Sequence, residues 1–378
     1  MEHCDILIVG AGPAGSSLAW ASGKSGYDVI VMDKQTFPRN KVCAGWVTPA
    51  IIKSLQIDIN DYCKGRVLQP ITGFRIGRIG RHETETCVDD HPISYGIRRC
   101  EFDHYLLERS GARLKLGEPF RNMVRTDKSW IVNGAIQSPL VVGAGGHYCP
   151  VARFIGNKSG HSEPVVVAQE IEFRMTPAQR ENCKVSPDIP ELYFCEDFKG
   201  YGWIFRKGDF LNIGLGREDK NKLSEHVRAF CEFLRQLKKI PRDISHKFNG
   251  HAYLLYQHSP RQVLADGILL IGDSAGLAYS QSGEGIRTAI ESGILAAEVI
   301  KNARGNYSSK YLDFYLKLIT KRFGKRKTTG NISKMLPDKV KNFLAHKLLS
   351  NSWFTRNIII DNWFLHTDQQ PLLINKTI

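Results

Sequence analysis

Three glycines near the start of the chain stand at the spacing that a nucleotide phosphate requires. Gly10, Gly12 and Gly15 follow the apolar run 5–9, which predicts a buried strand, and residues 16–23 continue as a predicted helix. The first glycine permits a tight turn, the second lets backbone approach a pyrophosphate, and the third lets helix and strand pack closely. The amides at the helix N-terminus would then face the phosphate charge.

An acidic residue follows where such a site binds a ribose. A second predicted strand, 28–32, ends in Asp33, about 20 residues beyond Gly12, where the dinucleotide fingerprint places the acid that bonds ribose hydroxyls. A glycine turn beside an ordinary surface aspartate is the alternative interpretation. Strand, turn, helix, strand and acid in register favour a dinucleotide site, without indicating which dinucleotide it binds.

Composition indicates an ordinary globular protein. The 378 residues are 42% apolar and 24% charged, which suits one large domain or two interleaved ones. The nine cysteines are scattered, without CxxC pairs or clustered histidines, so we expect neither a disulfide framework nor a bound metal. No apolar stretch approaches the roughly 18 residues that span a bilayer, and no signal-peptide pattern is present. We therefore expect a cytoplasmic protein.

Most of the net charge of +14 lies near the C-terminus. Residues 301–356 contain fourteen Lys or Arg against two acidic residues, and from Lys321 to Trp353 basic side chains alternate with apolar and aromatic ones at roughly helical spacing. This pattern is typical of an amphipathic helix that contacts an anionic membrane, and equally of a solvated helical tail. No DNA- or RNA-binding motif accompanies it, so nucleic acid is not an expected partner.

Nucleotide-binding patterns occur at both ends of the chain. Buried strands that end in glycine turns recur at 140–146 and 267–276, whereas 164–217 is mostly predicted strands whose turns contain Gly and Asp. A charged helix is predicted at 222–237. An antiparallel sheet inserted between two nucleotide-binding parts indicates interleaved domains.

Four stretches between residues 5 and 303 resemble the FAD-dependent oxidoreductases of the aromatic-hydroxylase fold, most closely their geranylgeranyl reductase branch. They are GAGPAG at 10–15, FPRNKVCAGW at 37–46, RCEFD at 99–103, and GDSAG to GEGI between 272 and 286. The resemblance implies an α/β fold with a Rossmann-like FAD-binding domain, an interleaved antiparallel β-sheet substrate domain and C-terminal helices. The expected boundaries are 1–65, 95–160 and 255–305 for the FAD-binding domain, 66–94 and 161–254 for the substrate domain, and 306–378 for the basic helical region.

The resemblance also implies which residues hold FAD. Asp33 would bind the adenosine ribose and Asp273 the ribityl chain, although an aspartate after a buried strand is also an ordinary helix cap. Arg99 would contact the cofactor, or form an ion pair with Asp103 or Glu101. The residues expected at the cofactor are Gly10, Gly12, Pro13, Ala14, Gly15, Asp33, Lys34, Lys41, Ala44, Gly45, Arg99, Gly272, Asp273, Gly283, Gly285 and Ile286.

Three residues are candidates for catalysis. Cys43 lies in a segment that resembles the RxKxCGG of this family, where Ala44 departs from the glycine pair and would narrow the space over the flavin. Its thiol would donate a proton or gate the site, although a buried thiol is more often a small apolar side chain. Tyr201 and Trp203 resemble the aromatic strand of the reductase branch. Because they are two residues apart, their rings share one face of a strand, where they would wall a slot for a long apolar ligand or simply form sheet core.

The resemblance implies a reductase that uses FAD. It would reduce C=C bonds of an isoprenoid or similarly long apolar substrate by hydride transfer from reduced flavin. An external electron donor is expected, because no second GxGxxG unit is present. FAD-dependent monooxygenases and halogenases share the fold, so they stay open as an alternative. The WxWxIP stretch of the halogenases is partly matched by YGWIF. A flavoprotein partner that modifies or senses another protein is the third hypothesis. The segment with Lys41 and Cys43 favours the reductase.

Overall fold

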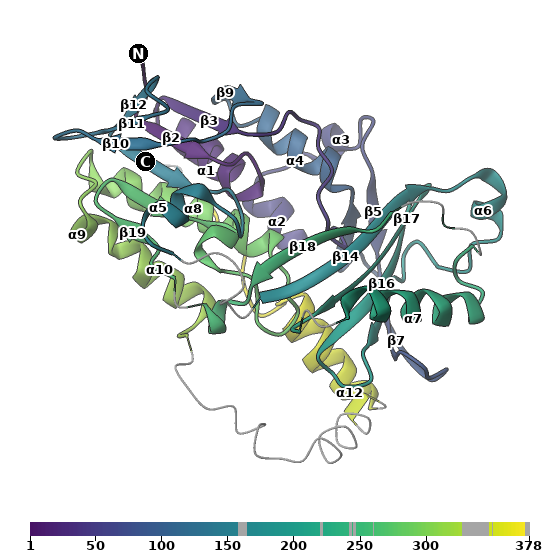
Figure 1. Ribbon diagram of the computed structural model, residues 1–378. Coiled ribbons are helices and arrows are strands. Elements are labelled where there is room, and N and C mark those ends of the chain that lie inside the picture. Colours follow the sequence, from purple (N-terminus) through teal and green to yellow (C-terminus); the bar gives the residue numbers. More distant parts are fainter. Residues whose placement is uncertain are drawn as a thin grey trace.

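The computed structural model describes residues 1–157, 165–219, 222–241, 244, 247–259, 261–326, 348–349 and 351–374. A mainly parallel sheet with its helices occupies one end of the molecule, and a large, mainly antiparallel sheet occupies the other (Figure 1). Both were expected from the sequence, and the Rossmann-like α/β fold is confirmed.

Six strands of the described residues form the first sheet, in the order β19-β20-β13-β2-β3-β9, parallel except at β19. Its central strands are apolar runs, which suits a sheet covered on both faces. Helices α1 (Pro13–Gly23) and α8 (Ile286–Ala303) pack closely, since a Cβ at Gly293 would lie 2.6 Å from the Ala14 carbonyl oxygen. The strands are β2 (Ile6–Val9), β3 (Val29–Asp33), β9 (Arg113–Leu116), β13 (Leu140–Gly143), β19 (Leu264–Ala265) and β20 (Ile268–Leu270).

The second sheet has the order β18-β14-β17-β16-β15-β6-β7, counting strands of the described ranges only. Neighbours are antiparallel except β15 and β6. Helix α7 (Leu223–Gln236) covers one face, where the Phe230 ring fills the space above Gly202. The strands are β6 (Gly73–Arg78), β7 (Thr84–Val88), β14 (Val165–Arg174), β15 (Glu191–Phe194), β16 (Gly200–Lys207), β17 (Phe210–Arg217) and β18 (Asn249–Leu254).

Smaller elements complete the described part of the fold. Strands β4 (Trp46–Val47), β8 (Ser94–Ile97) and β5 (Leu68–Ile71) pair with one another, and β1 (Glu2–His3), β12 (Ile136–Ser138), β11 (Trp130–Val132) and β10 (Met123–Arg125) form a further sheet. The short helices are α2 (Pro49–Ser54), α3 (Ile59–Tyr62), α4 (Arg99–Glu108), α5 (Pro150–Phe154), α6 (Pro177–Glu181), η1 (Tyr256–His258) and η2 (Gly272–Ala275).

The described part of the C-terminal region divides between the two sheets. Helices α9 (Ser309–Leu312) and α10 (Phe314–Phe323) bury Leu312 and Tyr315 in the core of the parallel sheet. Helix α12 (Ser352–Phe354) leads into the π-helical segment η4 (Thr355–Phe364), which packs beneath the second sheet (Figure 1, yellow). Much of the basic stretch from Lys321 to Trp353, namely 327–347 and 350, lies outside the described residues. Among the helices described, none has the length and apolar character to cross a bilayer.

Candidate cofactor and substrate site

A large cavity lies between the two sheets. Its volume is about 1040 Å³, at the upper end of ordinary ligand pockets, which span about 300–1,000 Å³. Of the residues predicted from the sequence, those that line it are Gly10, Gly12, Pro13, Ala14, Asp33, Lys34, Lys41, Cys43, Ala44, Gly45, Arg99, Tyr201, Trp203, Asp273, Gly283, Gly285 and Ile286. Gly15 and Gly272 are not part of the lining. The fold therefore brings the predicted cofactor and catalytic residues from both ends of the chain to one cavity.

The glycine turn after β2 serves both the fold and the cavity. Gly10 has φ +119°, and a Cβ there would lie 2.4 Å from the Ala144 backbone, while a Cβ at Gly15 would lie 2.0 Å from the Gly10 carbonyl oxygen. A Cβ at Gly12 would meet only the tip of Arg39, at 3.4 Å. Packing therefore requires the first and third glycines. The second faces open space, with the uncapped N-terminus of α1 beside it, as a phosphate site requires.

Asp33 lies at the end of β3 with its carboxylate held over this turn. Its two oxygens accept hydrogen bonds from the backbone amides of Ala11 and Gln35, each at 2.9 Å. A carboxylate has about four lone-pair positions, so it can accept further hydrogen bonds from hydroxyl groups in the cavity. This geometry fits the ribose-binding role expected for Asp33.

Two guanidinium groups share one carboxylate beside the turn. Arg99 donates to both oxygens of Asp103 at 2.8 Å, and Arg39 lies 3.4 Å from the same side chain. Burial lowers the pKa of Arg99, but attraction to Asp103 and then to Cys43 outweighs it and leaves that pKa raised. The ion-pair interpretation of Arg99 is thus confirmed, although Arg99 also lines the cavity. Because two guanidinium groups share one carboxylate, a net positive charge lies next to the glycine turn after β2.

Lys41, His251 and Asp273 form a polar cluster on the cavity wall. The Lys41 Nζ lies 2.9 Å from the His251 ring nitrogens, and His251 Nε2 lies 3.8 Å from Asp273 Oδ2. Burial lowers the pKa of Lys41 to about 8 and also lowers that of His251. Burial would raise the pKa of Asp273, but His251 and then Lys41 hold it low. The Asp273 carboxylate therefore faces the cavity as an anion, and in this form it can accept hydrogen bonds from the hydroxyl groups of a ribityl chain.

The pKa of Lys41 makes cofactor affinity depend on pH. Lys41 loses its proton as the pH rises through about 8, and a neutral amine is a weaker hydrogen-bond donor to the ribityl hydroxyl groups expected beside Asp273. We expect FAD affinity to fall by about tenfold between pH 7.5 and 9. In Lys41→Met, affinity should be lower at pH 7.5 and nearly flat over this range. Fluorescence titration with FAD measures both, and an unchanged pH slope in the variant would contradict the assignment.

These features fit an FAD-type dinucleotide. The open face of Gly12, the Asp33 carboxylate, the excess of guanidinium groups and the polar cluster at Asp273 provide for the phosphates, the ribose and the ribityl chain in one cavity. Helix α8, whose N-cap is Gly285, begins at the wall of this cavity, and the Glu284 carboxylate, which also lines the cavity, accepts a hydrogen bond from the Arg287 amide at 2.6 Å.

Side chains of the second sheet hold the backbone of Cys43. The Cys43 amide donates to Glu170 Oε2 at 3.2 Å, and the Cys43 carbonyl accepts from Asn212 Nδ2 at 3.1 Å. Asn212 also donates to Glu170 Oε1 at 2.7 Å, and it accepts from Trp203 Nε1 at 2.8 Å. We call Glu170, Asn212 and Trp203 the Cys43 clamp. Glu170 and Asn212 were not predicted as site residues. The available signal was Glu170 and Glu172, two acids that alternate with apolar residues in a predicted strand.

The aromatic wall of the cavity is also sheet core. The rings of Tyr201 and Trp203 lie on one face of β16, as predicted, with centroids 6.1 Å apart. Tyr201 contacts Phe364 of η4 at 5.3 Å, and Trp46 stacks on Phe205 at 5.4 Å. Tyr201 and Trp203 therefore pack against a buried aromatic cluster of the sheet core, and both residues also line the cavity.

The position of Trp203 depends on a missing side chain in β17. A Cβ at Gly214 would lie 2.1 Å from the Trp203 ring, whereas one at Gly216 would find its nearest neighbour at 3.7 Å, an ordinary contact. We expect Gly214→Ala to lower the free energy of unfolding by about 1–3 kcal/mol. Gly216→Ala, in the same strand, should change it by less than about 1 kcal/mol. Urea unfolding measures both, and equal effects would contradict this account.

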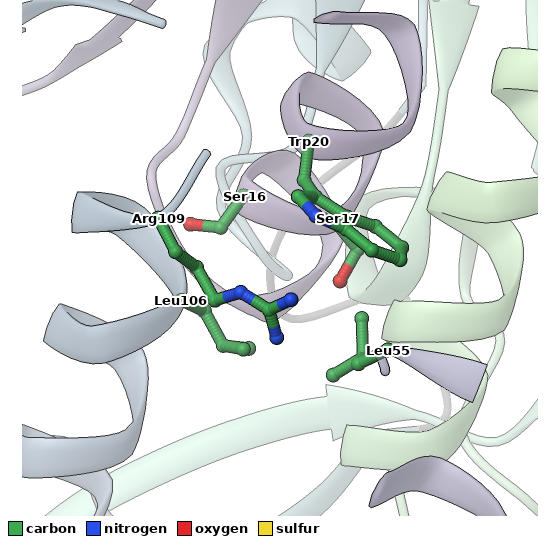
Figure 2. A pocket seen from close by; sticks show the side chains of 6 residues that line it. All are labelled: Ser16, Ser17, Trp20, Leu55, Leu106 and Arg109. Carbon is green, nitrogen blue, oxygen red and sulfur yellow. The ribbon is translucent and has the colours of Figure 1, made fainter. Parts of the chain in front are cut away.

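A smaller hollow lies beside helix α1, which follows the glycine turn. Figure 2 shows it between α1 and α4, with Arg109 beside the Trp20 ring and the hydroxyl groups of Ser16 and Ser17 nearby. Ser16 is bonded to the Ala11 carbonyl at 3.1 Å. None of the residues predicted to bind a ligand lines this hollow.

Comparisons with known proteins agree with this geometry. Residues 8–40 match the model of the NAD(P)-binding Rossmann-like domain. The chain is 27% identical over 318 residues to digeranylgeranylglycerophospholipid reductase of Methanocaldococcus jannaschii, covering 79% of this chain and 77% of that one. It is 29% identical over 359 residues to digeranylgeranylglycerophospholipid reductase 2 of Methanosphaera stadtmanae, covering 88% and 87%.

Solved structures share the fold. A geranylgeranyl bacteriochlorophyll reductase-like protein of Thermoplasma acidophilum aligns with a TM-score of 0.73 at 22% identity, over 100% of this chain and 94% of that one. The flavin-dependent brominase Bmp2 aligns with a TM-score of 0.71 at 17% identity, over 96% and 92%. The resemblance found in the sequence is thus confirmed by sequence relatives over most of the chain and by neighbours in fold.

Proposed function

We propose that this chain, a relative of the geranylgeranyl reductase family, is an FAD-dependent oxidoreductase that reduces carbon–carbon double bonds of an isoprenoid or similarly long apolar substrate. One observation carries the proposal. A single cavity joins the dinucleotide-binding residues Gly12, Asp33 and Asp273 to a wall that holds Cys43 and Trp203. The sequence relatives, whose names describe reductases of a geranylgeranyl lipid, support this substrate class.

Each part of the cavity has its own task. Gly12 and the first amides of α1 would bind the pyrophosphate, Asp33 the ribose, and Asp273 with Lys41 the ribityl chain. Bound FAD supplies the electrons, delivered as hydride to a substrate carbon. The protein must place that carbon correctly and exclude water.

The aromatic cluster provides an apolar wall. Trp203, Tyr201 and Trp46 line the cavity, and Phe364 closes the cluster from the side of η4. Large rigid rings orient a polyisoprenoid chain without polar contacts, since such a chain offers only methyl and methylene groups and double bonds.

Cys43 lies between the cofactor residues and this wall. Reduction of a double bond requires a proton for the second carbon, and the half-buried Cys43 thiol lines the cavity where both parts meet. The clamp from the second sheet fixes its backbone at both the amide and the carbonyl. We propose that Cys43 donates this proton and that Tyr201 and Trp203 orient the substrate.

Anaerobic single turnover tests the function. Enzyme loaded with FAD and reduced by dithionite is mixed with a digeranylgeranylglycerophospholipid in detergent. We expect oxidation of the flavin and a gain of two hydrogen atoms per reduced double bond in the lipid, seen by mass spectrometry. A lipid that stays unchanged, with oxidation only after oxygen is admitted, would contradict the reductase. Incorporation of oxygen or halogen into an added aromatic substrate would then favour the alternative enzymes of this fold.

The substrate class also suggests contact with a membrane. Leu348 and Trp353 are 43% and 66% exposed at the C-terminal side of the basic stretch, and Lys321 lies at its start. We propose that this region binds anionic lipid surfaces. Flotation with vesicles containing phosphatidylserine should recover the protein at low salt, and Trp353→Ser should reduce recovery by about threefold or more. Equal recovery with neutral vesicles would contradict an electrostatic contribution.

A further inference from the structure

A group of buried charges lies directly behind Cys43. Glu170 and Glu172 are two residues apart on β14, so both side chains point to the same side of the sheet. Lys207 from β16 lies 2.9 Å from Glu172 Oε2, and Arg98, which precedes α4, lies 3.0 Å from Glu172 Oε1. Arg98 also pairs with Glu101. Three carboxyl groups therefore face two cations.

Both cations form ion pairs with Glu172, and neither forms one with Glu170 in the part of the chain that the structure describes. Among the contacts of the described residues, the Glu170 carboxyl bonds two neutral donors, the Cys43 amide and the Asn212 amide group. Glu170 is nevertheless only 6% exposed. A buried carboxylate without an ion-pair contact is unfavourable, so the charge balance among these contacts singles out Glu170 as the carboxyl that keeps its proton.

The orientation of Asn212 leads to the same residue. Trp203 donates to Asn212 Oδ1, which directs the Asn212 NH₂ group to the opposite side. There it meets Glu170 Oε1 at 2.7 Å, the Cys43 carbonyl at 3.1 Å and Glu172 Oε2 at 3.2 Å. An NH₂ group has two hydrogen atoms for these three acceptors. One acceptor is in excess, which a proton on a carboxyl group relieves.

The two glutamates respond to this setting in opposite directions. Burial raises the pKa of Glu170 to about 7, with attraction to Lys207 opposing this and repulsion by Glu172 adding to it. Burial also acts to raise the pKa of Glu172, but attraction to Lys207, followed by its hydrogen bond and by Arg98, leaves that pKa lowered. Neighbouring carboxyl groups whose pKa values are separated in this way can take different roles in proton transfer.

We propose that Glu170 stores the proton that replaces the one given up by Cys43, an inference that rests on the proposed reductase function. When a double bond is reduced, the second carbon gains a hydrogen as the Cys43 S–H bond breaks. The thiolate then regains a proton as the Glu170 O–H bond breaks, and the Glu170 carboxylate takes up a proton from the bulk buffer, whose acid form becomes its conjugate base. These steps transfer protons only, and neither Cys43 nor Glu170 is oxidised or reduced. Because Glu170 acts through Cys43, it is a positioning and proton-storing residue.

The first test observes the proton itself. Infrared difference spectra of the FAD-loaded enzyme between pH 5.5 and 8.5 should contain a C=O band of a buried carboxylic acid that titrates near pH 7. Glu170→Gln should remove this band. Glu172→Gln should move its midpoint to lower pH, because the charge that raises the pKa of Glu170 is gone. An unchanged band in both variants would overturn the proposal.

Glu284 provides the matched control. It also lines the cavity, and burial raises its pKa to about 7, but its carboxylate accepts from the Arg287 amide and not from the Cys43 segment. Glu284→Gln should remove a different carboxyl band. It should leave the pH dependence of Cys43 alkylation, measured peptide by peptide by mass spectrometry, as in the parent enzyme.

The second test follows the thiol. Ionisation of Glu170 places a negative charge on the carboxyl group that bonds the Cys43 amide, so the rate of Cys43 alkylation as a function of pH should contain an inflection near pH 7. In Glu170→Gln the rate at pH 8 should increase by up to about tenfold. If Glu170→Gln does not fold, Glu172→Gln should still move the inflection to lower pH. A profile without inflection in the parent enzyme would overturn the proposal.

These readouts separate the two proposals. If the carboxyl band and the alkylation profile behave as expected but no lipid is reduced, the proton store is real and the reductase function is wrong. If lipid is reduced and Glu170→Gln has the same single-turnover rate and pH profile as the parent, the reductase function stands and the proton store does not.

Discussion

Gly15→Val is expected to abolish FAD binding and to lower the free energy of unfolding by about 3 kcal/mol. A Cβ at this position would lie 2.0 Å from the Gly10 carbonyl oxygen and 3.1 Å from the Ile8 side chain. Backbone on one side and the central strand of the sheet on the other leave no room, so α1 must move away from β2. The first amides of the helix then no longer face the phosphate.

Two further glycines of α1 and its turn make this prediction specific. In Gly12→Ala the added methyl group would meet only the guanidinium tip of Arg39, so we expect nearly unchanged stability. We expect about 100-fold weaker FAD binding, because the methyl group occupies the space for the phosphate. Gly23→Ala, at an ordinary contact distance of 3.6 Å, should bind FAD normally and gain up to about 1 kcal/mol. Thermal unfolding and FAD titration of the three variants measure both effects.

The series has a clear contradicting outcome. If Gly12→Ala binds FAD as well as the parent protein does, the open face of the turn is not the phosphate site. If Gly15→Val keeps both stability and binding, helix α1 does not depend on the close packing described here.

Cys43→Ser is expected to lower the rate of lipid reduction by about 100-fold or more, which is the usual size of a proton-donor contribution. Serine keeps the shape of the side chain and the backbone bonds to Glu170 and Asn212, so FAD binding and stability should be unchanged. A thiol has a pKa of about 8.5 and releases its proton far more readily than a serine hydroxyl group does. The loss therefore reports proton donation and not a change in geometry.

Single turnover with reduced enzyme measures this rate without the electron donor. Cys63→Ser, at an exposed cysteine outside the cavity lining, is the control and should retain full rate. A Cys43→Ser enzyme that reduces the lipid at the parent rate would assign Cys43 to a structural role and would leave the source of the proton open.

The parts of the fold that were predicted correctly depend on local patterns. The strand at β2, the turn at Gly10 and the acid at Asp33 lie within one short stretch, where apolar runs and glycine spacing determine the structure. Helix α7 and the strands of the second sheet likewise follow from periodicity.

The Cys43 clamp depends on contacts between distant segments and was not predicted. Glu170 pairs with Gly214 across β14 and β17 and reaches Cys43, which is 127 residues away in the chain. The sequence does not reveal which strands become neighbours, so the hydrogen-bond partner of an acid within a strand cannot be identified from the sequence. The same limit applies to His251, whose bond to Lys41 joins β18 to the segment before Cys43.

The central claim is that residues from both ends of the chain converge on one FAD. Equilibrium dialysis of the purified protein against FAD tests it most directly, with the parent chain, Gly12→Ala and Asp273→Ala compared side by side. We predict one FAD bound per parent chain, a yellow protein after removal of free cofactor, and strongly weakened binding in both variants. A parent protein that stays colourless in excess FAD would contradict the account.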